Sequence, residues 1–178
     1  MMSSEYQQAD RYQSIQLHNM QSYNDAIYET FLQMNPGDYD KQSHFFHGRY
    51  ENIYIDAKKI PALVHLLELI QQQAARCLNA QAAQIKMGFW LNVMNPGDTT
   101  TRHCHDDLDE VLSGVYYVKV PENSGKLVVY TPEPDEIQPQ EGLLVLFSPA
   151  LDHAVLRNDS DDIRLSIAFN VCLQESNS

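Results

Sequence analysis

The sequence predicts a mainly β protein, in which N-terminal helices lead into an antiparallel jelly-roll barrel. Two observations support this fold class. Helical periodicity is confined to the part of the chain before residue 84, and after it seven or so short apolar segments alternate with turn signals. No helical pattern separates those segments, which is typical of a β-sandwich or barrel. The length of 178 residues fits a single domain with its own core.

Two segments before residue 84 have helical spacing. Residues 24–34 place Ile27, Phe31 and Met34 on one face, with Asn24 as a candidate N-cap and the sequence NPGD as a stop. Residues 60–78 form the second segment, in which Pro61 suits the first helical turn. Their apolar face consists of Leu63, Leu66, Leu67, Ile70 and Ala74. We therefore expect residues 1–84 to form a helical elaboration packed on the barrel.

The predicted barrel covers residues 85–174, and residues 175–178 are expected to form a tail. The expected strands are QIKMGFWLNVM, TTTRHCH, VLSGVYYVKV, KLVVYTP, GLLVLFSP, HAVLR and RLSIAFNVCL, in chain order.

Composition limits the kinds of partner. The chain has 12 Lys and Arg against 24 Asp and Glu, so its formal net charge is -12 and nucleic acid is a poor partner. Cys77, Cys104 and Cys172 are far apart, which suits a reducing compartment. The first ten residues lack the pattern of a secretory signal, and no apolar run is long enough to span a bilayer. We expect a cytoplasmic protein without membrane partners. Such barrels often pair through exposed strands or terminal helices, so a homodimer is an open expectation.

The segment RHCHDD contains candidate metal ligands. If it is a strand, His103, His105 and Asp107 lie on one face, because alternate residues share a face. His153 follows the apolar segment GLLVLFSP and is a candidate distal ligand. Two histidines and one carboxylate on one side of a metal, with open positions opposite, are typical of non-heme Fe(II) oxygenases. The alternative is that His103 and His105 are surface residues and His153 a hydrogen-bonded core histidine.

Arg164 and Ser166 follow His153 in the last predicted strand and also share a face. A guanidinium can hold a carboxylate through two parallel hydrogen bonds, and a hydroxyl can add another. The alternative role for Arg164 is a surface ion pair with the preceding acidic residues 159–162.

Taken together, these segments resemble the 2-oxoglutarate/Fe(II)-dependent dioxygenase superfamily over residues 88–171. The similarity is closest to a small bacterial and phage branch with the motifs H-x-H, S-G-V-Y-Y and R-x-S-x-x-F-N. This resemblance implies a double-stranded β-helix that binds Fe(II) and 2-oxoglutarate and uses O2. It also implies release of succinate and CO2 while a small-molecule, peptide or protein substrate is hydroxylated. Arg164, assisted by Ser166, would bind the C5 carboxylate of 2-oxoglutarate. Tyr117 could donate to the same group if it points inward, and its alternative role is that of a packed barrel aromatic.

The resemblance leaves the metal ligands open. His105, Asp107 and His153 match the usual H-x-D pattern with its distal histidine, and the carboxylate would lower the net charge of the iron site. The spacing to the tyrosines that follow favours His105 as the first ligand, whereas the spacing to the preceding sequence NPGD makes His103 the first ligand and His105 its partner. We prefer the set with Asp107 and keep His103 as the rival ligand.

A cupin-type metal site is the second interpretation. Gly97, His103, His105 and Glu110 fit the start of the cupin motif G-x5-H-x-H-x4-E, with His153 as a further ligand. The motif then fails, because Tyr117 stands where its closing glycine should be, and a cupin has no need of Arg164. A non-catalytic binding barrel that has lost its chemistry is the third interpretation.

Overall fold

The computed structural model describes residues 12–46, 48–105 and 109–174. The two α-helices are α1 (Gln21–Gln33) and α2 (Pro61–Cys77), and short 3-10 turns lie at η2 (Pro36–Asp38), η3 (Ala57–Lys59) and η4 (Ala82–Gln84). The strands are β1 (Gln13–Gln16), β2 (Lys41–Phe46), β3 (Arg49–Tyr54), β4 (Ile85–Met94), β5 (Thr100–His103), β6 (Leu112–Lys119), β7 (Leu127–Thr131), β8 (Glu133–Ile137), β9 (Leu143–Phe147), β10 (His153–Val155) and β11 (Arg164–Leu173).

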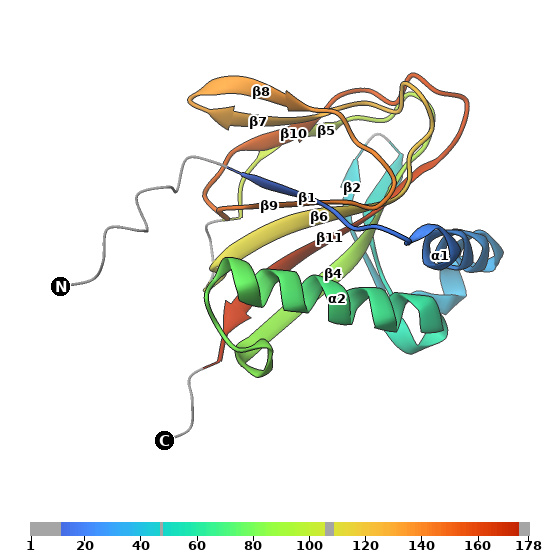
Figure 1. The fold of residues 1–178 in the computed structure, drawn as a ribbon. Coiled ribbons are helices and arrows are strands. Elements are labelled where there is room, and N and C mark those ends of the chain that lie inside the picture. The colour runs from blue at the N-terminus through green and yellow to red at the C-terminus, as the bar shows by residue number, and fades with distance from the viewer. Residues whose placement is uncertain (1–11, 47, 106–108, 175–178) are drawn as a thin grey trace.

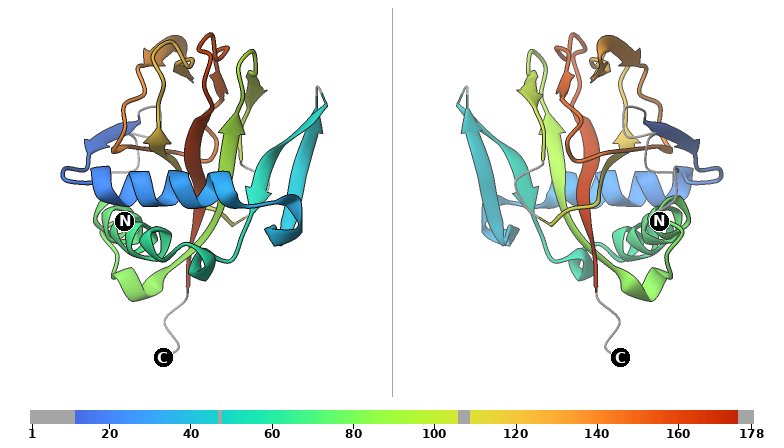
Figure 2. Two further views of the ribbon diagram at one scale, coloured as in Figure 1. Left: turned by 90° about the vertical axis from the view of Figure 1, so that its right-hand side faces the viewer. Right: turned by 90° about the vertical axis from the view of Figure 1, so that its left-hand side faces the viewer.

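The strands form two antiparallel sheets that lie one above the other (Figure 1). The larger sheet has the order β1-β9-β6-β11-β4-β3-β2, and the smaller has the order β5-β10-β7-β8. Both helices lie on the outer face of the larger sheet, and the smaller sheet lies on the opposite face (Figure 2). The predicted mainly β fold with N-terminal helices is confirmed, and the two sheets form the double-stranded β-helix.

Strand β11 shows how the sequence produces these layers. Its odd-numbered residues Leu165, Ile167, Phe169 and Val171 are fully buried in the core beneath the helices. Its even-numbered residues point toward the smaller sheet, since successive side chains of a strand face opposite ways. Of these, Arg164 and Ser166 are buried, and Ala168 and Asn170 line a cavity. One strand therefore supplies apolar residues to one layer and polar residues to the other.

The helical prediction for residues 1–84 holds for α1 and α2 but not for the whole segment. Strand β1 pairs with β9 at one edge of the larger sheet, and the β2–β3 hairpin continues the sheet beyond β4 at the other. The larger sheet thus contains strands from both sides of residue 84. A domain boundary at that residue stays a prediction. Asn24 is not an N-cap, because α1 begins three residues earlier and the Asn24 side chain is buried, accepting a hydrogen bond from Tyr116. Within the described residues, no helix has the length and apolar character needed to cross a membrane.

Candidate functional site

A cavity of about 530 Å³ lies between the two sheets. This volume is within the range of roughly 300–1,000 Å³ that is usual for small-molecule sites. The larger sheet contributes residues of β2, β3, β4, β6, β9 and β11, among them Trp90, Asn92, Arg164 and Ser166, and the smaller sheet contributes residues of β5, β7 and β10. The two groups of residues singled out in the sequence, the histidines and the arginine-serine pair, both line this cavity.

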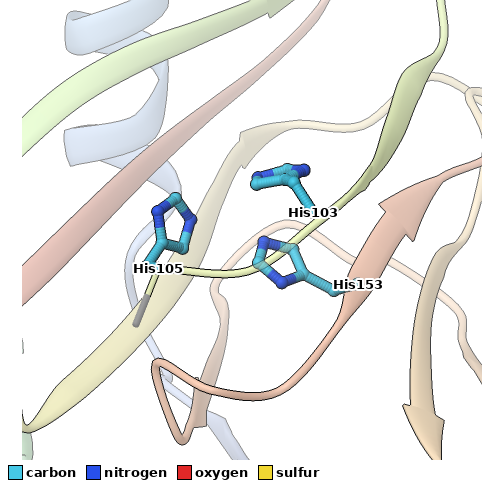
Figure 3. Close-up of side chains that lie close together, drawn as sticks. All are labelled: His103, His105 and His153. Carbon is cyan, nitrogen blue, oxygen red and sulfur yellow. The ribbon is translucent and has the colours of Figure 1, made fainter. Parts of the chain in front are cut away.

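Three histidines converge on the smaller-sheet side of the cavity (Figure 3). His103 on β5 and His153 on β10 are directly opposite each other across the two antiparallel strands, with ring centroids 4.3 Å apart. His105 follows β5, where its backbone N–H donates to the carbonyl of Pro149 at 2.7 Å. One ligand atom from each of the three rings lies within 4.8 Å of the others. This arrangement can hold one metal ion with modest side-chain adjustment, because imidazole nitrogens bind metals at about 2.0–2.1 Å.

Backbone carbonyls orient two of these imidazoles. Nδ1 of His103 lies 2.8 Å from the carbonyl oxygen of Thr101, and Nδ1 of His153 lies 2.9 Å from that of Leu151. Since a carbonyl can only accept, Nδ1 carries the hydrogen in each ring and Nε2 keeps its lone pair. Such a carbonyl partner is typical of metal-binding histidines.

Burial keeps His153 neutral. The ring is 7% exposed and packs against Phe147, with ring centroids 4.8 Å apart. Burial, followed by the proximity of His103, lowers the pKa of His153 from 6.5 to about 4. At neutral pH its lone pair is therefore available to a metal.

We expect the metal-free protein to lose stability as the pH falls from about 6.5 to 4. The unfolded chain takes up a proton on His153 near pH 6.5, and the folded chain resists it until about pH 4. The His153 contribution is thus complete above pH 6.5 and decreases by up to about 3 kcal/mol through this window. Urea unfolding between pH 4 and pH 7.5 tests this, with His153→Gln as the comparison. The expectation is contradicted if the free energy of unfolding depends on pH equally in the wild type and in His153→Gln.

The strand that carries the histidines ends earlier than predicted. Strand β5 stops at His103, so regular alternation does not place His105. Cys104, between the two histidines, lines the cavity together with both of them. Asp107, the preferred carboxylate ligand, lies outside the described residues.

Arg164 is fully buried at another part of the cavity. Its side chain is not in a surface ion pair, because the residue is 1% exposed and Nη1 donates to the backbone carbonyls of Ser124 and Gly125 at 3.0 and 2.8 Å. Nη2 lies 2.6 Å from the sulfur of Met94, which is a weak acceptor, and Nε has no hydrogen-bond partner within the part of the chain that the structure describes. Burial lowers the pKa of Arg164, but an arginine stays charged at neutral pH.

The free edge of this guanidinium fits a carboxylate. Nε–H and one N–H of Nη2 lie on the same edge, and that edge is the one without a strong acceptor. No carboxylate of the described residues forms an ion pair with Arg164. An uncompensated buried cation is costly, so the site favours an anionic ligand.

Ser166 and Tyr117 are directly opposite each other on β11 and β6, and both line the cavity. Tyr117 is 1% exposed, and its ring centroid lies 5.8 Å from the guanidinium carbon of Arg164. Burial raises the pKa of Tyr117, and Arg164 opposes that rise. Tyr117 is therefore a neutral hydroxyl close to the arginine.

Several cavity residues were not predicted from the sequence. Glu51 is 8% exposed and accepts a hydrogen bond from Thr100, and Arg49 joins this hairpin to Asp98 through a contact of 2.9 Å. His44 and Asn52 also line the cavity. His44, Arg49, Glu51 and Asn52 belong to the β2–β3 hairpin. No local sequence motif indicates that this hairpin lies beside β4.

The structure does not place Glu110 with the three histidines, as the cupin interpretation requires. Glu110 lines the cavity, but its Oε1 accepts from the amide of Asn170 at 3.5 Å, and it is not part of the histidine group. Among the described residues, that group consists of His103, His105 and His153 alone.

Comparison with protein families identifies one match. The family described as "Putative 2OG-Fe(II) oxygenase" matches residues 88–137 and 135–170, which include the three histidines, Arg164 and Ser166. No functionally curated protein sequence matches the chain.

Solved structures share the fold over almost the whole chain. A Pseudomonas putida prolyl-4-hydroxylase is 18% identical, with a TM-score of 0.73 over 92% of this chain and 93% of that one. A Trichoplax adhaerens prolyl hydroxylase, solved with a peptide of hypoxia inducible factor, is 15% identical, with a TM-score of 0.71 over 93% and 84%. The carbocyclase SnoK from nogalamycin biosynthesis is 15% identical, with a TM-score of 0.69 over 96% and 83%.

The family match covers the segments that build the cavity, and the solved structures contain the same double-stranded β-helix. Residues 88–170 therefore match a 2OG-Fe(II) oxygenase family, and nearly the whole chain shares its fold with enzymes of that kind; the match implies Fe(II) and 2-oxoglutarate as cofactors and O2 as a reactant.

Proposed function

We propose that His103, His105 and His153 hold the Fe(II) of this oxygenase. The observation that supports the set is the convergence of the three rings, two of which are turned by backbone carbonyls so that Nε2 is available. Asp107, which the H-x-D pattern favours, stays an alternative ligand. Three neutral imidazoles leave the charge of a divalent ion uncompensated, which favours an anionic ligand at the remaining positions.

We propose further that Arg164 binds the C5 carboxylate of 2-oxoglutarate, with Ser166 and Tyr117 beside it. The support is a buried guanidinium that Nη1 fixes to two carbonyls and whose other edge lacks a strong acceptor. The Tyr117 hydroxyl can donate to the same carboxylate, since burial keeps it protonated. This is the observation that distinguishes a 2-oxoglutarate site from a metal site alone.

The residues of the chain prepare the reaction in three ways. Iron, when bound, supplies the oxidative chemistry that couples decarboxylation of 2-oxoglutarate to oxidation of the substrate. Arg164 fixes the distal end of the co-substrate, and so orients its 2-oxo acid group toward the histidines. Phe147 and Trp90 lie against the histidines, with ring centroids 4.8 Å from His153 and 6.0 Å from His105, and restrict water around them.

The substrate is a small molecule or a peptide, and hydroxylation of a C–H bond is the reaction we propose. Peptides are supported by the structural similarity to a prolyl hydroxylase solved with a peptide. The net charge of -12 supports our proposal that nucleic acid is not a substrate.

The proposed site predicts a spectroscopic signature. Anaerobic addition of Fe(II) and then 2-oxoglutarate to the metal-free protein should produce the weak visible charge-transfer band of the chelate. Arg164→Ala is expected to remove the band at 2-oxoglutarate concentrations that saturate the wild type, while Fe(II) still binds. Arg76→Ala, which replaces an exposed arginine of α2, is the matched control and should keep the band. A band of unchanged intensity and affinity in Arg164→Ala would refute the proposed role.

A further inference from the structure

A polar cluster on β2, β3 and β4 lines the cavity, and the proposed function does not use it. His44 is its most exposed member and lines the cavity with Asn52 and Asn92, so the cluster lies where the cavity opens. Nδ1 of His44 is 2.9 Å from Nδ2 of Asn52 and 3.0 Å from Oγ of Ser43. Asn92 in turn donates to Oδ1 of Asn52 at 3.5 Å.

The backbone at His44 is unusual. Its φ is +56°, in the left-handed region that residues other than glycine seldom adopt. Ser43 pairs with Asn52 and Phe45 pairs with Tyr50, but the ladder is interrupted at His44 and at Glu51 opposite it. In a regular strand His44 would point away from Ser43, whereas here its ring contacts the side chains of both Ser43 and Asn52. A strained conformation thus places this imidazole at the cavity, and such strain is common at functional sites.

The hydrogen bonds of His44 determine which nitrogen faces a ligand as a donor. The amide nitrogen of Asn52 can only donate, so Nδ1 of His44 is an acceptor. A neutral imidazole with an accepting Nδ1 carries its hydrogen on Nε2. That Nε2–H has no hydrogen-bond partner among the described residues. His44 therefore offers one oriented donor to a molecule in the cavity.

The charged side chains that line the cavity favour a ligand with a neutral hydrogen-bond acceptor. Arg164 is the one cationic Lys or Arg side chain among the described lining residues, and the proposed function assigns it to 2-oxoglutarate. The other charged side chains are Glu51 and Glu110, which disfavour a second anion. Beside the cluster, the rings of Tyr54 and Trp90, 6.1 Å apart, provide an apolar surface. A carbonyl oxygen next to an apolar group matches these features.

We propose that Nε2–H of His44 binds an amide carbonyl of the substrate, so that the substrate is a peptide or another N-acyl amino acid amide. This inference rests on the proposed function, because it names the substrate class of the same cavity. His44 is a positioning residue: it holds the substrate and takes no part in the chemistry at the metal.

The test uses His44→Gly and a panel of N-acetyl amino acid N′-methylamides, one for each standard amino acid. Glycine adopts a positive φ without strain, so the variant should be at least as thermally stable as the wild type while it lacks the donor. Succinate formed from 2-oxoglutarate is measured with Fe(II) and O2, with and without each amide. We expect at least one amide to raise succinate formation by the wild type above the amide-free background.

For that amide, His44→Gly should raise KM about tenfold to a hundredfold, which is the size expected for a lost hydrogen bond to a site group. The change in kcat should be smaller than the change in KM. Ser43→Ala is the matched control, because it removes a neighbour of Nδ1 and leaves Nε2–H in place, and its KM should stay within about threefold of the wild type. Quenching of Trp90, the single tryptophan of the chain and a lining residue, gives the affinity of the amide independently of turnover.

Two results would overturn the inference. One is that no amide stimulates a wild-type protein that forms the chelate band, and the other is that His44→Gly leaves KM and the Trp90 response unchanged. A wild-type protein that forms neither the band nor background succinate would instead overturn the proposed function. The two failures are therefore distinguishable.

Discussion

Replacing His103 with alanine is expected to lower the affinity for Fe(II) more than a hundredfold, whereas Asp107→Ala should change it less than about tenfold. His103 lies opposite His153 on the neighbouring strand, and its Nε2 is one of three imidazole nitrogens that converge. Loss of a ligand should exceed the roughly 10–100-fold that loss of a ligand's hydrogen-bond partner costs. Anaerobic titration with Fe(II), followed through Trp90 fluorescence, measures both variants, because Trp90 lies close to His105.

The reverse result would assign the site differently. If Asp107→Ala loses Fe(II) and His103→Ala keeps it, the ligands are His105, Asp107 and His153. His103 is half-buried at the cavity, so its replacement should not unfold the protein, and circular dichroism checks this. His153→Ala should lose the metal under either assignment and serves as the positive control.

Replacing Gly125 with alanine is expected to destabilise the fold by about 2–5 kcal/mol and to weaken 2-oxoglutarate binding. Gly125 has a φ of +87°, and a Cβ there would lie 2.1 Å from the backbone oxygen of Leu156. A left-handed alanine costs about 1–2 kcal/mol, and overpacking adds about 1–3 kcal/mol. The carbonyl of Gly125 also accepts from Nη1 of Arg164, so a shift of this turn moves the guanidinium.

Urea unfolding and the chelate band measure the two effects of Gly125→Ala. Gly88→Ala is the control, since a Cβ at Gly88 meets no atom within 4 Å and its φ is not positive. Its unfolding free energy should stay within about 0.5 kcal/mol of the wild type. If Gly125→Ala lowers the free energy of unfolding no more than Gly88→Ala does, the turn at Gly125 can relax and the prediction is wrong.

The sequence predicted those features that depend on short-range spacing. Alternation along β11 put Arg164 and Ser166 on one face, and that face lines the cavity. Helical spacing located α2 and its buried face, because the apolar residues there recur with a clear period. His103 and His153 lie together because β5 pairs with β10 in one particular register. The spacing of residues along the sequence does not determine that register. For His105, a backbone bond to Pro149 beyond the end of β5 holds the chain in place, and no alternation rule predicts that contact.

The β2–β3 hairpin shows why the rest was not predictable. Its residues have little periodic apolar pattern, and its place in the sheet is determined by pairing between Asn52 and Asn92, forty residues apart. His44 reaches the cavity through a left-handed backbone that histidine does not favour intrinsically. Arg49 attaches the hairpin to β4 through the carbonyl of Val93 and to the turn after β4 through Asp98. These long-range contacts decide the position of the segment, and local sequence does not encode them.

The two-sided strand β11 restricts how this sequence can evolve. Inserting or deleting one residue within it would turn Arg164 and Ser166 toward the apolar layer and Leu165 and Ile167 toward the cavity. Pairing with β4 along the whole strand and with β6 along most of it leaves no free edge to absorb such a change. Insertions and deletions among homologous chains should therefore be absent from β11 and should occur in the turns. Substitutions within β11 should be polar at even-numbered positions and apolar at odd-numbered positions.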